Sequence, residues 1–389
     1  MLQFLFFLSI GILVYVYFLY PFLIWFISLI HSREIKPDGS YLPSISLIIA
    51  AYNEENVIEE KIRNSLNLNY PKEKLEIIIV SDGSEDATNH LVKKYRDKGV
   101  ILFEKSPRGG KTRALIYSIP KSRNNIVILS DANTMYHPNS IRELVRYMKD
   151  KRVGAVTGDV KIINESNEFG RQENLYYLYE RFIQLCESKI GSIIGVDGAM
   201  YALRKEAYLE PSPDIVLDDF VISMNAIRKG YRVIYNPRAL AWENATPSVK
   251  QEIRRRKRIT AGAIQGIIQN EGIPGSTQIV EWLMYISHKL LRWFTSFFML
   301  VILLSNFLLL GSPLWNLFFL LQIAFYLLVM LGWILAQRAL PAFLKIPFYF
   351  FMVNYAALIG IFKGLFGMQK VTWAKADRNL VRMPKEETQ

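Results

Sequence analysis

Apolar side chains are concentrated toward the two ends of the chain. Residues 1–30 carry no charged side chain, and residues 293–336 are nearly as bare. A helix rises about 1.5 Å per residue, so the first stretch reaches roughly 45 Å, more than the roughly 30 Å of a bilayer's hydrocarbon core. The pattern predicts an N-terminal membrane helix over 1–30, bent at Pro21, and further spans over 294–310, 314–335 and 347–366.

The flanking charges predict how these spans are oriented. The first stretch lacks the basic start and the small-residue cleavage site of a signal peptide. Arg33 and Lys36 follow it, so the positive-inside rule predicts an external N-terminus and a cytoplasmic chain from residue 31 onward. Three further spans would place the tail outside, whereas its basic residues, including Lys370 and Lys375, favour the inside. A re-entrant last segment would reconcile the two, and we expect a cytoplasmic tail.

Between the apolar ends, residues 44–244 alternate short strand-like runs with amphipathic helical ones. Strands are predicted over 44–51, 75–80, 100–103, 126–129 and 153–160, and helices over 54–66, 85–96, 110–118, 138–148 and 221–228. This βαβα rhythm predicts a mostly parallel sheet covered on both faces. Residues 161–190 read as a long amphipathic segment, whose Leu175, Leu178, Phe182 and Leu185 are expected to pack.

Composition and charge narrow the class of protein. The chain is 51% hydrophobic and 13% aromatic with a formal charge of +12, which is unlike a simple soluble enzyme. A basic surface could bind nucleic acid. Residues 248–293 instead combine basic runs with apolar residues at helical spacing beside membrane spans, which favours anionic lipid headgroups. The single cysteine, Cys186, excludes an intrachain disulfide and is expected to lie in the core.

The strand over 126–129 runs directly into Ser130, Asp131 and Asn133. Ligands of open α/β sheets bind at the carboxyl ends of the strands. Asp131 and Asn133 offer two hard oxygen ligands, which suits Mg²⁺ or Mn²⁺ completed by substrate phosphates. The alternative is a simple strand-ending turn, because these residue types are also common in turns.

Loops at three neighbouring strand ends favour a ligand-binding role for Asp131 and Asn133 over a simple strand-ending turn. Ala51-Tyr52-Asn53-Glu54 offers an aromatic ring that could stack on a base, and Asp82 could accept a hydrogen bond from a base N–H. In Arg108-Gly109-Gly110-Lys111, backbone N–H groups, a helix start and a cation could converge on phosphate. Together these loops predict a nucleotide-diphosphate site. A P-loop is excluded because Lys105 stands where its first glycine is required, and no dinucleotide fingerprint follows the first strand.

Two later motifs add acids and small residues. Gly195-Val196-Asp197-Gly198 places small residues where a backbone could approach a ligand closely. Asp218 and Asp219 open a helical pattern, where acids can simply complement the helix dipole. Alternatively, one of them is a general base.

Taken in order, these motifs resemble the family-2 glycosyltransferases, and in particular the membrane-embedded branch with the cellulose, hyaluronan, chitin and poly-N-acetylglucosamine synthases. The resemblance covers roughly residues 44–268 and the flanking spans. Its motifs are Ala50-Ala51-Tyr52-Asn53-Glu54-Glu55, Val80-Ser81-Asp82-Gly83-Ser84, Gly110-Lys111-Thr112-Arg113-Ala114-Leu115, Ser130-Asp131-Ala132-Asn133, Asp218-Asp219 and Arg255-Arg256-Lys257-Arg258-Ile259-Thr260-Ala261-Gly262.

The resemblance implies a Rossmann-like α/β domain of the GT-A fold, inserted between transmembrane helices, and inverting transfer from a UDP-sugar. It implies that Tyr52 stacks on uracil, Asp82 binds its edge, Lys111 contacts the diphosphate and Asp131 stands at the first acid of the metal motif. Asp219 would be the catalytic base and Arg258 a diphosphate-binding arginine.

Three positions depart from the family pattern. Asn133 replaces the second metal-binding acid, and Asp218 replaces a glutamate. Arg255 and Ile259 stand where the family's Gln-x-x-Arg-Trp motif has Gln and Trp, and that Trp forms an acceptor platform in polymer-forming members.

The sequence therefore predicts an integral inner-membrane enzyme with a cytoplasmic catalytic domain. The predicted divisions are an anchor (1–30), a catalytic domain (44–247), amphipathic interfacial helices (248–293), C-terminal spans (294–368) and a basic tail (369–389). The predicted reaction extends a β-linked polysaccharide and is coupled to export. The alternative enzyme adds one sugar to a lipid carrier or glycolipid. A transporter, or a scaffold that binds nucleotide or lipid without catalysis, is the remaining hypothesis.

Overall fold

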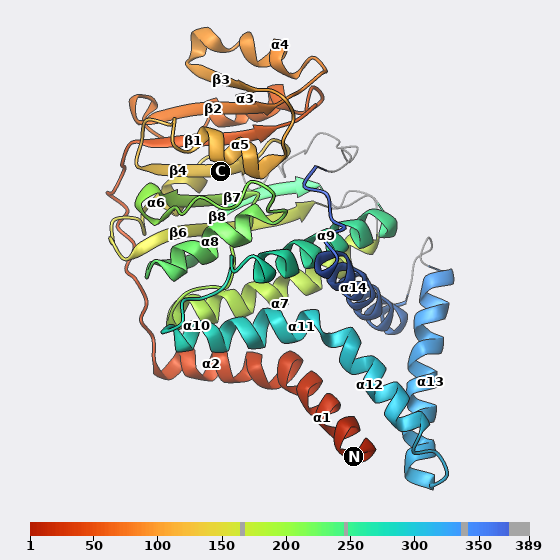
Figure 1. Ribbon diagram of the computed structural model, residues 1–389. Coiled ribbons are helices and arrows are strands. Elements are labelled where there is room, and N and C mark those ends of the chain that lie inside the picture. Colours follow the sequence, from red (N-terminus) through yellow and green to blue (C-terminus); the bar gives the residue numbers. More distant parts are fainter. Residues whose placement is uncertain (164–167, 245–247, 336–340, 373–389) are drawn as a thin grey trace.

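The centre of the molecule is an eight-stranded mixed sheet with strand order β3-β2-β1-β4-β7-β6-β8-β5 (Figure 1). The computed structural model describes residues 1–163, 168–244, 248–335 and 341–372. The strands are β1 (Ile45–Ala51), β2 (Leu75–Asp82), β3 (Val100–Lys105), β4 (Ile126–Asp131), β5 (Met135–Tyr136), β6 (Val153–Ile163), β7 (Met200–Arg204) and β8 (Arg232–Asn244).

The strands that carry the predicted motifs are parallel and in register. β1 pairs with β2 on one side and β4 on the other, so that Ala50 lies opposite Val80 and Asp131. This pairing brings the carboxyl ends of three strands to one edge. The prediction of a parallel sheet is confirmed for β1 to β4, whereas β7 runs antiparallel to both of its neighbours and β5 runs antiparallel to β8.

Helices cover both faces of the sheet, as expected for apolar strands buried on both sides. One face packs against α3 (Ile58–Leu66), α4 (Thr88–Lys93) and α6 (Ser140–Val145). The other packs against α5 (Lys111–Ser118), α7 (Glu168–Ile190) and α8 (Asp218–Arg228). Short 3₁₀ turns are η2 (Lys72–Lys74), η3 (Arg96–Lys98) and η4 (Lys205–Ala207).

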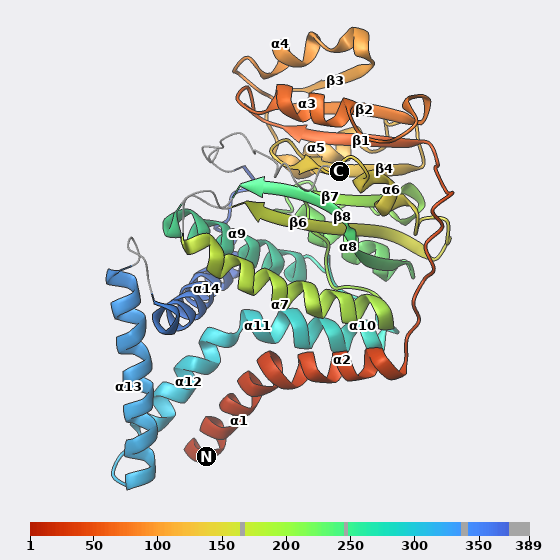
Figure 2. The ribbon, with the colours of Figure 1, turned by 180° about the vertical axis from the view of Figure 1, so that it is seen from behind.

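The core on the second face continues into the helices of the apolar chain ends. Tyr20, Ile24 and Tyr285 belong to the same buried cluster as Ile48 of β1 and Val127 of β4. Cys186 is buried there too, as predicted. Figure 2 shows α7 and α10 between the sheet and α2.

The helices outside the sheet domain are listed here in chain order. They are α1 (Leu2–Val14), η1 (Tyr15–Leu19), α2 (Tyr20–Ile30), α9 (Val249–Ile268), α10 (Ile279–Met284), η5 (Tyr285–Leu290), α11 (Leu291–Trp293), α12 (Thr295–Phe307), α13 (Pro313–Ile334) and α14 (Ala342–Leu365). η1 and η5 are π-helical turns, and η1 precedes Pro21 where the first helix bends (Figure 1).

Within the described residues, three helices are long and apolar enough to cross a membrane: Leu2–Ile30, Pro313–Ile334 and Phe343–Leu365. The predicted span 294–310 is not a complete one, because α12 has only 13 residues. α12 is long enough to cross a membrane only when it is taken together with Ile279–Trp293, and the two segments are bent by 58° relative to each other. The last part of the predicted interfacial region (248–293) and this predicted span are therefore two helical segments that meet at a sharp bend.

α14 is set differently from the other candidate spans. In its most apolar 18-residue stretch, 50% of the residues are buried within the protein. The corresponding values are 17% for Leu2–Ile30 and 11% for Pro313–Ile334. Gly360 and Gly364 pack directly on α9, since a Cβ on either would lie 2.7 Å from a backbone oxygen of that helix. In Figures 1 and 2, α14 runs below the sheet beside α9, whereas α13 points away from the sheet.

The described end of the chain returns to the sheet. The side chain of Val371 lies 2.8 Å from the position that a Cβ on Gly110 would take, at the start of α5. The part of the predicted tail from residue 373 onward lies outside the described residues.

The reading of 161–190 needs two corrections. β6 extends through Ile163, so 161–163 are strand rather than part of the amphipathic segment. Leu178 and Phe182 are 67% and 42% exposed, because the inward face of α7 carries Ile183, Cys186 and Ile190 instead. Leu185 packs against the buried cluster as predicted, and the side chain of Leu175 lies outside the described part of the chain.

Candidate active site

The carboxyl ends of β1, β2 and β4 border one cavity of about 1270 Å³. Its wall includes every predicted site residue except Ser130: Ala51, Tyr52, Glu54, Asp82, Lys111, Asp131, Asn133, Asp197, Gly198, Asp218, Asp219, Arg255 and Arg258. Ser130 is buried in β4, and its hydroxyl donates to the carbonyl of Asp131 at 3.1 Å. The fold thus gathers residues from four distant parts of the chain.

Lys111 lies at the centre of the acidic side chains. Its Nζ is 2.7 Å from Asp131 Oδ1 and 3.7 Å from Asp218 Oδ2, and it donates to the carbonyl of Gly198 at 3.2 Å. Burial alone would lower the pKa of this ammonium, but Asp131, Asp218 and Asp219 outweigh burial and raise it. Lys111 is therefore a permanent cation between strand β4 and helix α8.

Asp219 has the electrostatics of a general base. Burial, and then the neighbouring Asp218, raise the pKa of this carboxyl to about 7, against opposing contributions from Lys111 and from the Phe220 N–H. That N–H donates to Asp219 Oδ1 at 2.8 Å. A carboxylate with a pKa near the working pH can both accept and release a proton.

The loop Gly195–Gly198 lies directly against this base. A Cβ on Gly198 would lie 2.5 Å from Asp219 Oδ2, so only glycine allows this approach. The loop is held by Arg181 of α7, which contacts Asp197 at 3.0 Å and Asp159 at 3.1 Å. Sequence reasoning missed Arg181, which links the predicted Asp197 to the helix below the sheet.

The donor end of the cavity differs from the sequence prediction in one respect. Gly109 and Gly110 donate their backbone N–H groups to Asp82, at 2.5–3.0 Å, and Lys105 contacts the same carboxylate at 3.0 Å. The buried Asp82 thus accepts both of these N–H groups, and their convergence on a phosphate stays a prediction. The guanidinium of Arg108 stacks on the Tyr52 ring, 3.6 Å from its centre.

The two residues of the predicted metal motif, Asp131 and Asn133, offer side-chain oxygen atoms as metal ligands. Asn133 donates from Nδ2 to Glu243 at 2.7 Å, which makes its carbonyl oxygen the atom suited to a cation. The buried Oδ2 of Asp218 accepts no hydrogen bond from the described residues. Those residues include no cluster of three His, Cys, Asp or Glu able to hold a metal alone. The set therefore fits Mg²⁺ or Mn²⁺ that takes further ligands from a diphosphate.

Arg255 and Arg258 reach the cavity from α9. Arg255 is paired with the buried Glu252 at 2.8 Å and contacts the hydroxyl of Tyr177 at 3.2 Å. Arg258 donates to the carbonyl of Val216 at 3.1 Å, just before Asp218. The second arginine is therefore tied to the segment that carries the candidate base.

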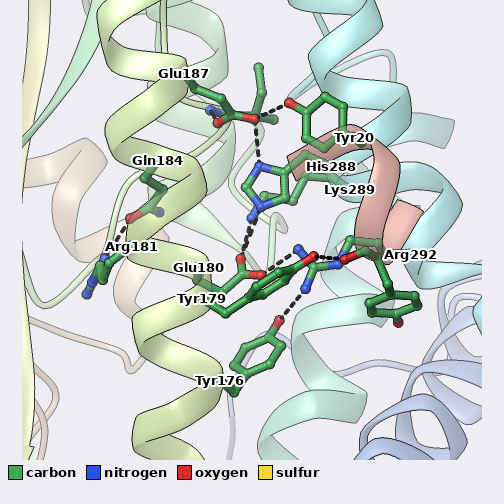
Figure 3. Close-up of polar contacts among 12 residues, drawn as sticks. Tyr20, Tyr176, Tyr179, Glu180, Arg181, Gln184, Glu187, His288, Lys289 and Arg292 are labelled. Carbon is green, nitrogen blue, oxygen red and sulfur yellow. Dashed lines mark hydrogen bonds and ion pairs between the residues drawn. The ribbon is translucent and has the colours of Figure 1, made fainter. Parts of the chain in front are cut away.

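A buried polar network, shown in Figure 3, contributes Glu180, His288 and Arg292 to the lining of the cavity. His288 lies between Glu187, 2.8 Å from Nδ1, and Glu180, 3.1 Å from Nε2. Arg292 also contacts Glu180, at 2.5 Å, and Tyr20 donates to Glu187 at 2.6 Å. Sequence reasoning missed this network. The polar residues at 180, 184 and 187 recur at helical spacing, which places them on one side of α7, and that pattern was the available signal.

Comparison with known proteins gives two kinds of likeness. A model of the family described as "Glycosyltransferase like family 2" matches residues 43–262. Poly-beta-1,6-N-acetyl-D-glucosamine synthases of Staphylococcus aureus and Staphylococcus epidermidis are 30% and 27% identical over 220 and 217 residues. These matches cover 54% of this chain in both cases, and 53% and 52% of the relatives. The chain thus spans about half the length of the curated relatives it matches.

A solved structure extends the likeness of the fold beyond the sheet domain. The mannosyltransferase PcManGT from Pyrobaculum calidifontis, in complex with GDP-Man and Mn²⁺, superposes with a TM-score of 0.72 at 20% identity. The match covers 94% of this chain and 100% of that one. At this identity the comparison establishes a shared fold.

Proposed function

This chain belongs to the family-2 glycosyltransferases, and on that premise we propose that it transfers a sugar from a UDP-sugar, with inversion, to a growing β-linked polysaccharide. The observation that carries the proposal is Asp219, a half-buried carboxyl with a pKa of about 7 that shares one cavity with Lys111 and Asp131. The staphylococcal relatives, which by name are polysaccharide synthases, support the product class.

Asp219 takes the proton of the attacking hydroxyl. The acceptor oxygen attacks the anomeric carbon from the face opposite the nucleotide, the O–H proton moves to the carboxylate, and the bond to the diphosphate oxygen breaks. Inversion in one step requires no enzyme nucleophile. Gly198 gives the acceptor side of this carboxylate close backbone contact without a side chain in the way.

Lys111 and Arg258 counter the charge that develops on the departing diphosphate. Lys111 reaches this position from the first turn of α5, and Arg258 from α9. A divalent ion, held by the carboxylate of Asp131 and the carbonyl oxygen of Asn133, would supply further neutralisation of the diphosphate. Tyr52 and Asp82 form the part of the cavity wall where the nucleobase of the donor is expected to bind.

We expect Asp131→Ala to abolish the metal-dependent part of nucleotide binding, because it removes the one carboxylate of the metal motif. The measurement is a UDP titration of the full-length protein by calorimetry, with Mn²⁺ and with EDTA. Mn²⁺ should strengthen binding by the wild type at least tenfold and leave the variant unchanged. Asp150→Ala, which removes a surface partner of Arg152 outside the cavity, is the control. Equal stimulation of Asp131→Ala and wild type would contradict the assignment.

Product length separates this proposal from the second candidate, addition of one sugar to a lipid carrier. That candidate is favoured by the cavity's lower wall, where Tyr17 of the first helix and Asn354 of α14 contribute. Purified protein supplied with a panel of radiolabelled nucleotide sugars identifies the donor. A ladder or high polymer supports polysaccharide synthesis, whereas a single lipid-soluble product supports the alternative.

For the membrane, we propose an inner-membrane protein with an external N-terminus, a cytoplasmic sheet domain and a cytoplasmic tail. In this topology the first helix runs from the outside to the cytoplasm, α12 runs from the cytoplasmic side to the outside, and α13 returns to the cytoplasmic side. α14, half buried against the protein and packed on α9, then lies along the cytoplasmic boundary instead of crossing. This arrangement agrees with the basic residues at both Arg33 and Lys370.

The topology predicts that Lys370→Cys is labelled by a membrane-impermeant maleimide in inside-out vesicles and is protected in right-side-out ones. The native Cys186 is the chain's one cysteine and is buried, so the added thiol gives the signal. Gln3→Cys should show the opposite pattern. Labelling of Lys370→Cys from the outside would show that α14 crosses the membrane.

A further inference from the structure

Two polar side chains of α3 hold the segment that follows the metal motif. Lys61 and Asn64 lie one helical turn apart, and the Nζ of Lys61 donates to the carbonyl of Thr134. Asn64 donates from Nδ2 to the carbonyl of Tyr136 at 2.8 Å, and its Oδ1 accepts from the N–H of Tyr136 at 2.9 Å. Because Thr134 directly follows Asn133, α3 fixes the end of the loop that carries the metal motif.

Lys61 is a buried amine, with a side chain that is 0% exposed. Lysine is almost never fully buried unless it is paired with an acid. Here the Nζ instead contacts a carbonyl and the ring of Tyr136, whose centre lies 3.9 Å away. Burial lowers the pKa of Lys61 to about 7, and the charge of Asp131 opposes this shift. The charged and the neutral amine can both donate to the Thr134 carbonyl, so the contact does not depend on the protonation state.

Asp131 thus lies between two amines that come from opposite faces of the sheet. Lys111 of α5 contacts its carboxylate at 2.7 Å and lines the cavity. Lys61 of α3 acts on the same charge from the other face and lies outside the cavity wall. Of these two amines, only Lys111 is therefore placed to meet the diphosphate, and Lys61 supports the loop from behind.

The ring beneath Lys61 also reaches the acceptor side of the site. Tyr136 is fully buried, and its hydroxyl donates to the carbonyl of Ala199 at 3.3 Å. Ala199 follows Gly198, whose backbone lies against Asp219. The segment that α3 holds is consequently packed between the metal motif and the loop beside the base.

We propose that Lys61 is a positioning residue for the divalent ion that accompanies the donor, an assignment that rests on the proposed transferase function. Groups outside the ligand set orient the ligands and tune the affinity of a metal site. By holding the buried Thr134 carbonyl, Lys61 keeps Asp131 and Asn133 directed at the cavity. An apolar side chain at this position leaves that carbonyl without its donor, and the loop must then shift to satisfy it.

The test compares Lys61→Met, Lys61→Gln and the control Lys72→Met in the full-length protein. Lys72 also donates to backbone carbonyls, those of Leu66 and Leu68 at the end of α3, but it lies outside the cavity. UDP is titrated by calorimetry over a series of Mn²⁺ concentrations and in EDTA. Lys61→Met should raise the Mn²⁺ concentration that gives half of the strengthening about tenfold, the size expected for one hydrogen bond from a charged group.

The other measurements separate positioning from stability. UDP affinity in EDTA should stay within about twofold of wild type in all variants, because the nucleobase wall is untouched. Lys61→Gln should recover part of the Mn²⁺ effect, since its amide can donate, and Lys72→Met should match the wild type. The melting temperature of Lys61→Met should remain within a few degrees of wild type, because methionine avoids the desolvation of a buried amine.

An unchanged Mn²⁺ requirement in Lys61→Met, or equal losses of UDP affinity with Mn²⁺ and with EDTA, would overturn the assignment. If Lys61→Met does not fold, Lys61→Gln is judged by the same two criteria. Wild-type UDP binding that Mn²⁺ does not strengthen would overturn it as well. Failure of the proposed function is a different result: wild-type protein whose UDP binding responds to Mn²⁺ but which transfers no sugar from any nucleotide donor.

Discussion

Asp219→Asn is expected to reduce sugar transfer at pH 7.5 by roughly 10²–10⁴-fold, the usual contribution of a general base. The amide keeps the size of the side chain and can still accept from the Phe220 N–H, but it cannot take the proton of the attacking hydroxyl. Initial rates of donor consumption with acceptor present measure the loss. Nucleotide affinity, measured separately, should stay within a few fold of wild type.

The same assignment predicts a pH dependence with a definite sign. Burial and Asp218 raise the pKa of Asp219 to about 7, and the base works only when ionised. For the wild type, kcat/KM should therefore rise about tenfold for each pH unit below pH 6. It should level off above pH 8, where Asp219 is ionised. Full transfer activity in Asp219→Asn would contradict the role of this carboxyl as a general base. A wild-type rate that stays constant from pH 5 to 8 would contradict it too.

Lys111→Met is expected to lower transfer by about 10²-fold, the typical effect of removing one group that stabilises developing charge. The substitution also leaves Asp131, Asp218 and Asp219 without the ammonium that faces all three. Because Lys111 lowers the pKa of Asp219, its loss should raise that pKa and move the acid limb of the rate profile to higher pH. Part of the lost activity should return at pH 9.

Lys229→Met provides the matched control, since this exposed ammonium contacts only backbone carbonyls outside the cavity. It should behave as wild type at every pH. An unshifted profile in Lys111→Met, with activity lost uniformly, would show that Lys111 binds the leaving group without acting on the base.

The strand-end motifs could be predicted because they depend on local pattern and on one general rule. Four apolar residues at 126–129 define a buried parallel strand, and parallel strands bring Tyr52, Asp82 and Asp131 to one edge. The placement of Asp219 beside them follows from the order of motifs. Its contact with Gly198 does not, because it depends on how a loop at residue 198 meets a helix start at residue 218.

The remaining misses concern groups whose partners lie far away in the sequence. Asp82 accepts from Gly109 and Gly110, so the glycine N–H groups that looked available to phosphate are occupied. Glu180 and Glu187 meet His288 across about a hundred residues, and the pattern of α7 alone suggested only packing. The composition of 347–366 predicted a span, and Phe343–Leu365 is long and apolar enough to be one, but its packing on α9 through Gly360 and Gly364 depends on tertiary contact.

The buried cluster on the second face of the sheet joins Val127 and Ile48 to Tyr20 and Tyr285 without a break. Closely packed interiors transmit displacement from one side chain to the next. Because one cluster joins the sheet to the apolar helices, the two parts are expected to unfold in a single cooperative event, with the helices acting as part of the foundation on which the strand of Asp131 rests.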